Sequence, residues 1–582
     1  MKNIKAFLLA ALVGLSFNSC NDFLTLEPLN DIVLENFWTD KSDVESVLLG
    51  AYSALESGDC VKSMVVWGET RSDNIVEGNN TPEDIRQICR ENLLITNSYC
   101  KYNKFYDVVN RANTVLYYAP IVADKDPNYL FSELKANEAE AITLRCLCYW
   151  YLIRTFHDVP YVTVPSIDDE GGHEKFYVPQ SPFEEILDSI INDLESVKRY
   201  AVNKYPESNA NTNRITKSAI SAMLADMYLW RGKAGDWDKC IKNCEEVTAR
   251  KMSDWSDLKS KQGKFCTVRS FNGYPLISDA PEEYAGNSYT EIFGEGNSFE
   301  SLFELPYNRD VSNPFVGDFY QNERSNNVGQ LKAFEKIGND FTISKGNDIF
   351  KQSNDSRYYQ NLKNRSSSYA ITKYAYDEVE LLIDGGTIKY DYASIRSNQV
   401  PANWIIYRYS EVLLFEAEAY VMKAKQLKVA GPDSLALNDS LRLWKTKAFD
   451  LIDAVNKRSI VADNNKVNNQ KTLAVVESYN DNSSVEDLET ILFQERRREL
   501  MFEGKRWYDL VRMARRDGNQ DRLIQFVEQK YDASTLGAVK IKLKNPYAMY
   551  FPLAKDEVRN SQKVLKQNPA YKDDEKIEQA SH

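Results

Sequence analysis

Acidic and basic side chains alternate in a short segment near the C-terminus, and these are the residues of the chain best placed for acid–base chemistry. The segment 494–512 reads QERRRELMFEGKRWYDLVR, in which Glu495 and Glu499 enclose three arginines. Two carboxylates that face a cleft can cleave a glycosidic bond. Each of these glutamates, however, has an arginine three positions away, which is the spacing of an ion pair along a helix. We therefore predict that the segment fixes helix packing through partly buried ion pairs.

Sequence motifs of the common enzyme classes do not occur in the chain. We find no nucleophile elbow, P-loop, dinucleotide fingerprint or metalloprotease helix. The histidines are His157, His173 and the terminal His582, which are too few and too scattered to predict a zinc site. We predict a binding protein with no catalytic residue, no metal and no cofactor.

The first twenty residues have the pattern of a lipoprotein signal. Lys2 and Lys5 precede the apolar stretch 6–17, which is too short to span a bilayer, and Ser19-Cys20 follows it. Cleavage before Cys20 would leave that residue with lipid on its sulfur and its amine, enough acyl chains for stable anchoring. The alternative is an ordinary secretory signal with an incidental cysteine. We predict a signal peptide over 1–19 and lipidation at Cys20.

Apolar residues recur at helical spacing through most of the chain, so helices must position any functional side chain. Ser181 and Glu184 also have the spacing of a capping box, with Pro182 in the first turn. Helices are expected over 40–56, 102–117, 134–156, 181–200, 215–230, 237–249, 407–425, 440–458 and 485–514. Paired amphipathic helices with short turns predict a mainly α fold with a tetratricopeptide-like scaffold, although no strict repeat is visible.

The middle of the chain breaks the helical pattern. It is rich in Asn, Ser, Gly and Tyr, with turn signals, and is too long to be a structureless loop. We expect an irregular, loop-rich subdomain with short strands, 371–376 and 387–392 among them. The predicted organisation is a signal peptide over 1–19, helical parts over 20–253 and 404–571, the irregular insertion over 254–403, and a polar tail over 572–582.

Composition describes a chain with an ample core and an acidic surface. Hydrophobic residues make up 43% and charged residues 27%, and the formal net charge is −13. Such a charge repels phosphate backbones, so nucleic acid is not an expected partner. Beyond Cys20, most of the other eight cysteines are expected to be small buried hydrophobes. Cys240 and Cys244 share a helix face, where the backbone rarely permits a disulfide.

Several ordered stretches together resemble the SusD/RagB family of nutrient-binding lipoproteins. The match begins at Cys20 and ends at Tyr571, and it is weakest in the irregular region. His157 stands where the family usually has glycine. The stretches are CNDFL at 20–24, NRAN at 110–113, EAEAITLRCLCYWYLIRTFHDVPYV at 138–162, ITK at 215–217, YRYSEVLLFEAEA at 407–419, the segment 494–512 and QNP at 567–569.

The resemblance implies a lid, anchored to the outer membrane and exposed at the cell surface, over a SusC-like TonB-dependent transporter. The implied ligand is an oligosaccharide, or alternatively a peptide, which the lid captures without cleaving it. Two other interpretations are a surface hydrolase and a tetratricopeptide scaffold lipoprotein with a protein partner.

The resemblance also suggests where a ligand binds, since the family builds part of its binding surface from loops in the N-terminal part. Sugar sites combine aromatic rings with polar side chains. The polar run 67–74 and the stretch 97–102 fit this description, as do tyrosines in the irregular region. Arg71 and Asp73 could instead merely hold their loop together. The candidate ligand-binding residues are Asp73, Tyr99, Tyr102, Tyr284, Tyr289 and Tyr320.

Overall fold

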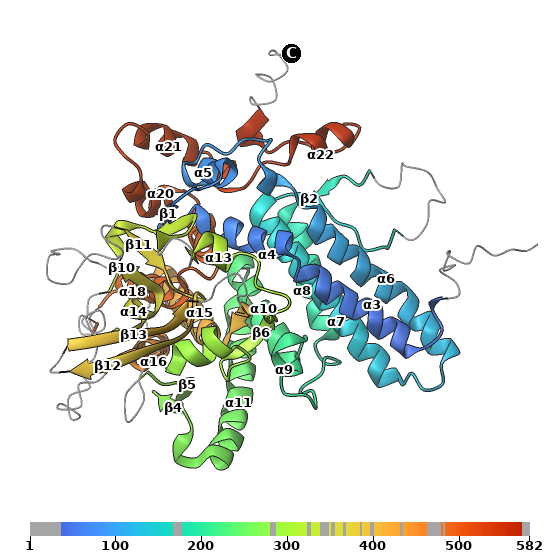
Figure 1. Ribbon diagram of the computed structural model, residues 1–582, viewed down its shortest axis with the longest axis horizontal. Coiled ribbons are helices and arrows are strands. Elements are labelled where there is room, and N and C mark those ends of the chain that lie inside the picture. Colours follow the sequence, from blue (N-terminus) through green and yellow to red (C-terminus); the bar gives the residue numbers. More distant parts are fainter. Residues whose placement is uncertain are drawn as a thin grey trace, which may run out of the picture.

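Long helices packed side by side form the N-terminal part of the protein (Figure 1). In the computed structural model, α3 (Lys41–Leu55), α6 (Asn103–Lys125) and α7 (Phe131–Phe156) pack against one another. The side chain of Asp40 caps α3 by accepting a hydrogen bond from the backbone N–H of Ser42. The helices predicted here from apolar spacing are confirmed, with shifted ends.

The structure describes most of the chain between its two ends. The predicted signal peptide, Cys20, and all of the polar tail except Lys572 lie outside the described residues. Within these residues, no helix has the length and apolar character needed to cross a membrane. The described residues are 37–166, 177–279, 287–322, 327–337, 349–350, 355–364, 368–384, 387–395, 401–430, 435–461, 479–480 and 483–572.

A second group of helices continues the scaffold. Helix α10 (Lys217–Arg231) packs against both α8 (Phe183–Val197) and α11 (Asp236–Gln262). Because α11 runs to Gln262, its end lies beyond residue 254, where we had expected the irregular region to begin. The apolar spacing fades in the charged second half of α11, so the pattern alone does not reveal the last turns of this helix.

The predicted capping box at the start of α8 is wrong. Pro182 occupies the N-cap position, and it makes no side-chain cap hydrogen bond. The backbone N–H of Phe183 instead donates to Oδ1 of Asp158, at 2.9 Å. A carboxylate from the turn after α7 therefore satisfies a backbone donor at the start of this helix.

Short strands and turns fill the irregular region. The segment 387–392 lies inside a strand as predicted, but 371–376 is mainly a turn, in which Tyr374 has a φ of 67°. One four-stranded sheet has the order β1 (Ile75–Glu77), β9 (Leu331–Ala333), β11 (Tyr369–Ile371) and β10 (Leu362–Asn364), so a strand from the N-terminal part of the chain belongs to it. The strands are β4 (Val268–Phe271), β5 (Tyr274–Ile277), β6 (Ser301–Leu305), β7 (Gln321–Asn322), β8 (Asn327–Val328), β9 (Leu331–Ala333), β10 (Leu362–Asn364), β11 (Tyr369–Ile371), β12 (Tyr376–Asp384) and β13 (Thr387–Ile395), with β1 (Ile75–Glu77) from the first part of the chain.

The segment predicted as one helix over 485–514 is two helices, α18 (Val485–Leu500) and α19 (Arg506–Asp517). Gly504 lies in the junction with a φ of 69°, which favours glycine. Gly68 lies against the junction, and a Cβ atom placed on it would be 1.7 Å from the carbonyl oxygen of Gly504. The two glycines therefore allow a close contact between the N-terminal and C-terminal helical parts.

Buried apolar side chains from both helical parts and the irregular region form one contiguous core. All eight cysteines in the described residues are free and buried, as predicted for most of them. The other elements are α4 (Gly58–Val65), the π-helix η2 (Val66–Thr70), α5 (Glu83–Cys89), η3 (Ser98–Cys100), β2 (Val159–Pro160), β3 (Gln180–Ser181), α9 (Ala210–Asn213), η5 (Gly263–Phe265), α12 (Asn287–Tyr289), η6 (Thr290–Glu295), α13 (Val316–Phe319), η8 (Glu335–Ile337), α14 (Ser356–Asn361), β14 (Trp404–Arg408), α15 (Tyr409–Ala430), α16 (Leu435–Arg458), α20 (Asp521–Val527), η10 (Glu528–Lys530), α21 (Leu536–Leu543), η11 (Pro546–Met549), α22 (Lys555–Asn560) and η12 (Pro569–Tyr571).

Candidate functional site

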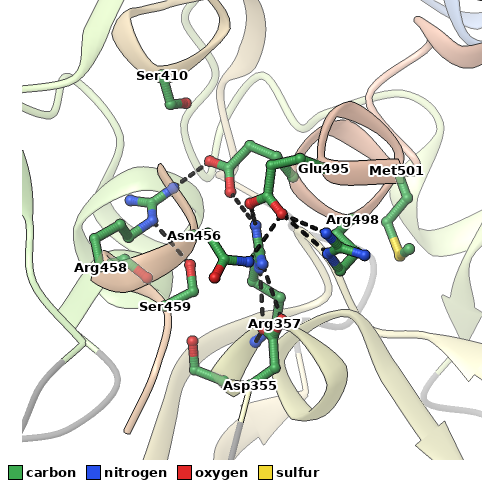
Figure 2. Close-up of polar contacts among 12 residues, drawn as sticks. Asp355, Arg357, Ser410, Asn456, Arg458, Ser459, Glu495, Arg498 and Met501 are labelled. Carbon is green, nitrogen blue, oxygen red and sulfur yellow. Dashed lines mark hydrogen bonds and ion pairs between the residues drawn. The ribbon is translucent and has the colours of Figure 1, made fainter. Parts of the chain in front are cut away.

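The acids of the charged segment lie in a buried cluster of ion pairs (Figure 2). Arg357 contacts Asp355 at 2.8 Å, Glu495 at 2.6 Å and Glu499 at 3.0 Å. Arg498 contacts Glu495 at 2.6 Å from one turn along the same helix. The prediction of ion pairs in this segment is confirmed, and Arg357 adds pairs that join α14 to α18.

Further cations surround the last two glutamates of the segment. Arg408 contacts Glu499 at 2.5 Å and Glu503 at 2.8 Å, while Arg458 pairs with Glu499 and Lys373 pairs with Glu503 at 2.6 Å. Burial alone would raise the pKa of Glu503, but Arg408 and Lys373 outweigh it and lower that pKa to about 2. These carboxylates are buried and already engaged by cations, so the arrangement fixes packing and offers no cleft for glycoside cleavage.

The polar run that includes Asp73 is also interior. Burial disfavours a charge on Asp73, but Arg497 at 2.9 Å and Arg506 at 2.8 Å outweigh it and lower the pKa of the carboxyl. Arg71 donates to both carboxylate oxygens of Glu91, at 2.9 and 2.7 Å. This geometry favours the second interpretation of Arg71 and Asp73, in which they hold the segment in place.

Two of the tyrosines expected at a ligand are fully buried. Tyr289 donates a hydrogen bond from its hydroxyl to the carbonyl oxygen of Thr372, and Tyr320 donates one to that of Phe502, both at 2.7 Å. Neither ring presents a face to solvent, so the structure gives both a packing role. Tyr284 lies outside the described residues.

The tyrosines of the stretch 97–102 differ in exposure. Tyr102 is only 6% exposed, and its ring packs 5.2 Å from that of Tyr106 and 5.5 Å from that of Phe156. Tyr99 is partly exposed, and its carbonyl oxygen accepts a hydrogen bond from the indole of Trp67 at 2.8 Å. Of the six candidates, Tyr99 alone has a described position and a side chain that is not fully buried.

An open cavity of about 570 Å³ lies next to the polar run, beside the outer strand pair of the four-stranded sheet. Its volume is within the range of small-molecule sites, roughly 300–1,000 Å³. We call it the β1–β9 cavity. It is lined by Val76, Glu77, Cys89, Arg90, Lys332, Phe334, Glu335, Lys530, Tyr531, Asp532 and Thr535.

Strand pairing and one ion pair shape the first wall of this cavity. β1 and β9 run antiparallel, with Val76 opposite Lys332 and Glu77 opposite Leu331. Arg90, just after α5, donates to both carboxylate oxygens of Glu77, at 2.6 and 3.0 Å. This bidentate contact orients the carboxylate and the guanidinium at the cavity surface.

The opposite wall comes from the C-terminal part. Lys530 donates to the carbonyl oxygens of three consecutive residues, 70 to 72, at 3.3, 3.1 and 2.8 Å, and burial lowers the pKa of its ammonium group. The next residue, Tyr531, has a buried hydroxyl oxygen with no hydrogen-bond partner among the described residues. Because buried polar atoms are seldom left unpaired, this hydroxyl is suited to a buried water molecule, and Tyr531 presents its ring to the cavity.

The cavity combines the chemical groups that a sugar site requires. Phe334 and Tyr531 are partly exposed and provide ring surface, while Glu77, Glu335 and Asp532 provide hydrogen-bond acceptors. Lys332 lies 3.7 Å from Glu335, so the charged groups are largely balanced. Such a lining fits a polar, uncharged ligand better than a strongly charged one.

Sequence reasoning identified the neighbourhood of this cavity but missed its lining residues. The polar run ends at Asn74, directly before β1, yet the run itself is buried and the exposed groups follow it. The polar residue at the end of β1 and the arginine after α5 could have drawn attention to Glu77 and Arg90. No local pattern connects them to Phe334 and Tyr531, because the sheet pairing and the three contacts of Lys530 bring those residues together.

Two family models match the chain. The model described as "SusD family" matches residues 295–571, and the model described as "Starch-binding associating with outer membrane" matches residues 22–229. Together they include both helical parts and much of the irregular region.

Individual relatives match over most of their length. "SusD-like protein P38" from Formosa agariphila is 25% identical over 88% of this chain and 91% of its own, and "SusD-like protein P2" from the same organism is 22% identical over 87% and 89%. A solved SusD superfamily structure from Bacteroides vulgatus has a TM-score of 0.62 at 17% identity, covering 92% of this chain and all of its own. The structure titled "B. fragilis NanU" has a TM-score of 0.60 at 16% identity, covering 94% and 100%. These structures share the mainly α fold.

Proposed function

Since this chain belongs to the SusD/RagB family, we propose that it captures an oligosaccharide at the outer membrane surface for import by a SusC-like TonB-dependent transporter. The observation that carries the proposal is the match of two family models, one of them described by starch binding and outer-membrane association, over most of the chain. In this proposal lipid on Cys20 holds the protein at the membrane, because an acidic protein gains little from anionic headgroups.

The β1–β9 cavity is the ligand site in this proposal. A sugar ring would lie against Phe334 or Tyr531, and its hydroxyl groups would meet the carboxylates of Glu77 and Glu335. Binding of this kind needs no cofactor. Tyr99 remains a second candidate contact, because its side chain is partly exposed and it lies on the same N-terminal segment.

Capture without cleavage is part of the same proposal. The carboxylates of the charged segment 494–512 are buried in ion pairs, and Glu77 at the cavity is held by Arg90. A general acid would need a carboxyl with a raised pKa facing the scissile bond.

Screening the purified protein on an array of glycans and peptides tests the function. We expect retention of one class of oligosaccharide, with the oligosaccharide recovered at its original length. Shortened products would identify a hydrolase, and retention of peptides alone would move the ligand class from glycans to peptides. Retention of a protein partner with no glycan binding would support the scaffold interpretation.

A further inference from the structure

A second cavity, of about 410 Å³, lies on the helical scaffold and has a cationic lining. Helices α8 and α11 provide its walls, and α10 packs between them with Tyr228 at the base. Lys198, Arg231, Lys239 and Lys242 line it, against the single carboxylate of Glu195. The excess of positive charge is local, since the whole chain has a net charge of −13. We call this cavity the α8–α11 groove.

Ion pairs close both ends of the α8–α11 groove. At one end Lys198 contacts Glu246 at 2.6 Å, which ties α8 to α11. At the other end Arg231 contacts Asp188 at 3.1 Å and Asp236 at 2.6 Å, which ties α8 to the junction of α10 and α11. These two cations are therefore neutralised within the fold and define the length of the groove.

Lys239 and Lys242 lie between the closed ends, one turn apart on α11, and both are exposed. Neither forms an ion pair with any residue in the described ranges of the chain. The ammonium nitrogen of Lys239 lies 5.3 Å from the centre of the Tyr228 ring, and the Tyr228 hydroxyl donates to Glu195 at 2.7 Å. The fixed ring therefore holds one unpaired cation over the groove.

We propose that the α8–α11 groove binds an acidic peptide segment of a protein partner, whose carboxylates pair with Lys239 and Lys242. Lysines present point charges on flexible stems, which suits side-chain carboxylates spaced along a peptide. A sugar fits less well, because Tyr228 provides the ring in the lining and is only 1% exposed, so it offers no face for stacking. The groove shares no lining residue with the β1–β9 cavity, so the two sites would act independently.

Fluorescence anisotropy with a labelled oligoglutamate peptide tests the proposal on the whole protein. We expect binding that weakens as salt rises, because the contact is between exposed charges. The double variant Lys239→Gln/Lys242→Gln should weaken binding about fivefold, the effect of two partly exposed ion pairs. Lys239→Arg/Lys242→Arg should retain it. The matched control Lys259→Gln/Lys261→Gln, which removes the same charge from the far end of α11, should bind as the wild type does.

Three results would overturn the proposal. The peptide does not bind, the control variant loses as much affinity as the groove variant, or oligogalacturonate binds more tightly than the peptide with the same dependence on Lys239 and Lys242. The last result would assign the groove to an acidic sugar. Thermal melts of each variant show whether the protein remains folded, and the arginine variant separates loss of charge from loss of the lysine stems.

Discussion

Arg506 donates two hydrogen bonds to the carboxylate of Asp73, at 2.8 and 3.1 Å, across 433 positions of the chain. The pair joins the start of α19 to the segment before β1, and it lies in the interior. Removing the charge by Asp73→Asn should lower the free energy of unfolding by about 3–5 kcal/mol, because it leaves buried arginines uncompensated. Urea denaturation measures this loss.

The matched control for this change is Asp107→Asn on α6. Its carboxylate is 57% exposed and 3.8 Å from Lys104, so the loss should stay within about 0.5 kcal/mol. Equal stability of the Asp73 variant and this control would contradict the buried-pair interpretation.

The two arginines that share Glu495 should differ in importance. Arg498→Ala leaves Glu495 with Arg357 and with Asn456 at 2.9 Å, so we expect a loss of about 3 kcal/mol. Arg357→Ala deprives Asp355, Glu495 and also Glu499 of a partner and should cost about 5 kcal/mol or more. Denaturation curves rank the variants, and ligand affinity of the folded protein should not change. A stable Arg498→Ala protein that has lost its ligand would place this cluster in the binding site.

Acid should weaken the fold through the buried glutamates with lowered pKa values. Glu503 has a pKa of about 2 in the fold against an ordinary 4.5. Its stabilising contribution is therefore complete above about pH 5 and is lost as the pH falls toward 2. Burial raises the pKa of Glu69, so the contribution of this residue to stability changes with pH in the opposite direction. Comparing the wild type with Glu503→Gln isolates the contribution of Glu503. The variant should show a smaller loss of unfolding free energy between pH 7 and pH 3, and an identical loss would refute the assignment.

Membrane attachment should depend on Cys20. Replacing the residue by alanine removes the sulfur that would carry lipid, so the protein should no longer incorporate labelled palmitate or sediment with membranes. The same replacement at the buried Cys266 provides the control and should leave labelling intact. Unchanged labelling of the Cys20→Ala protein would disprove the lipid anchor.

Apolar spacing was sufficient to predict the main helices, including α7 and α10, which are buried on all faces along much of their length. Gly504 is a local signal of a kink within 485–514, but the close contact of its carbonyl oxygen with Gly68 from a distant part of the chain has no local signal. The backbone at His157 explains why the resembled family usually has glycine at this position. His157 ends α7 with a φ of 72°, a backbone conformation in which glycine is least strained.

Residue type predicted the neighbourhood of the candidate site better than it predicted the residues that line the cavity. Asp73, Tyr289 and Tyr320 were selected by residue type, and the structure buries all three. Burial depends on which distant elements cover a segment, and local composition does not record it. The lining of the β1–β9 cavity comes from segments that only strand pairing and the contacts of Lys530 bring together.

Calorimetry on the β1–β9 cavity tests the central claim most directly, with an oligosaccharide found on the array as the ligand. Tyr531→Ala and Phe334→Ala should each weaken binding roughly five- to thirtyfold, because a lost stacking ring removes about 1–2 kcal/mol. Phe265→Ala removes a ring that is 72% exposed elsewhere and should bind as the wild type does. Normal affinity in both cavity variants, with loss of affinity in Tyr99→Ala, would contradict this account and move the site to the segment around Tyr99.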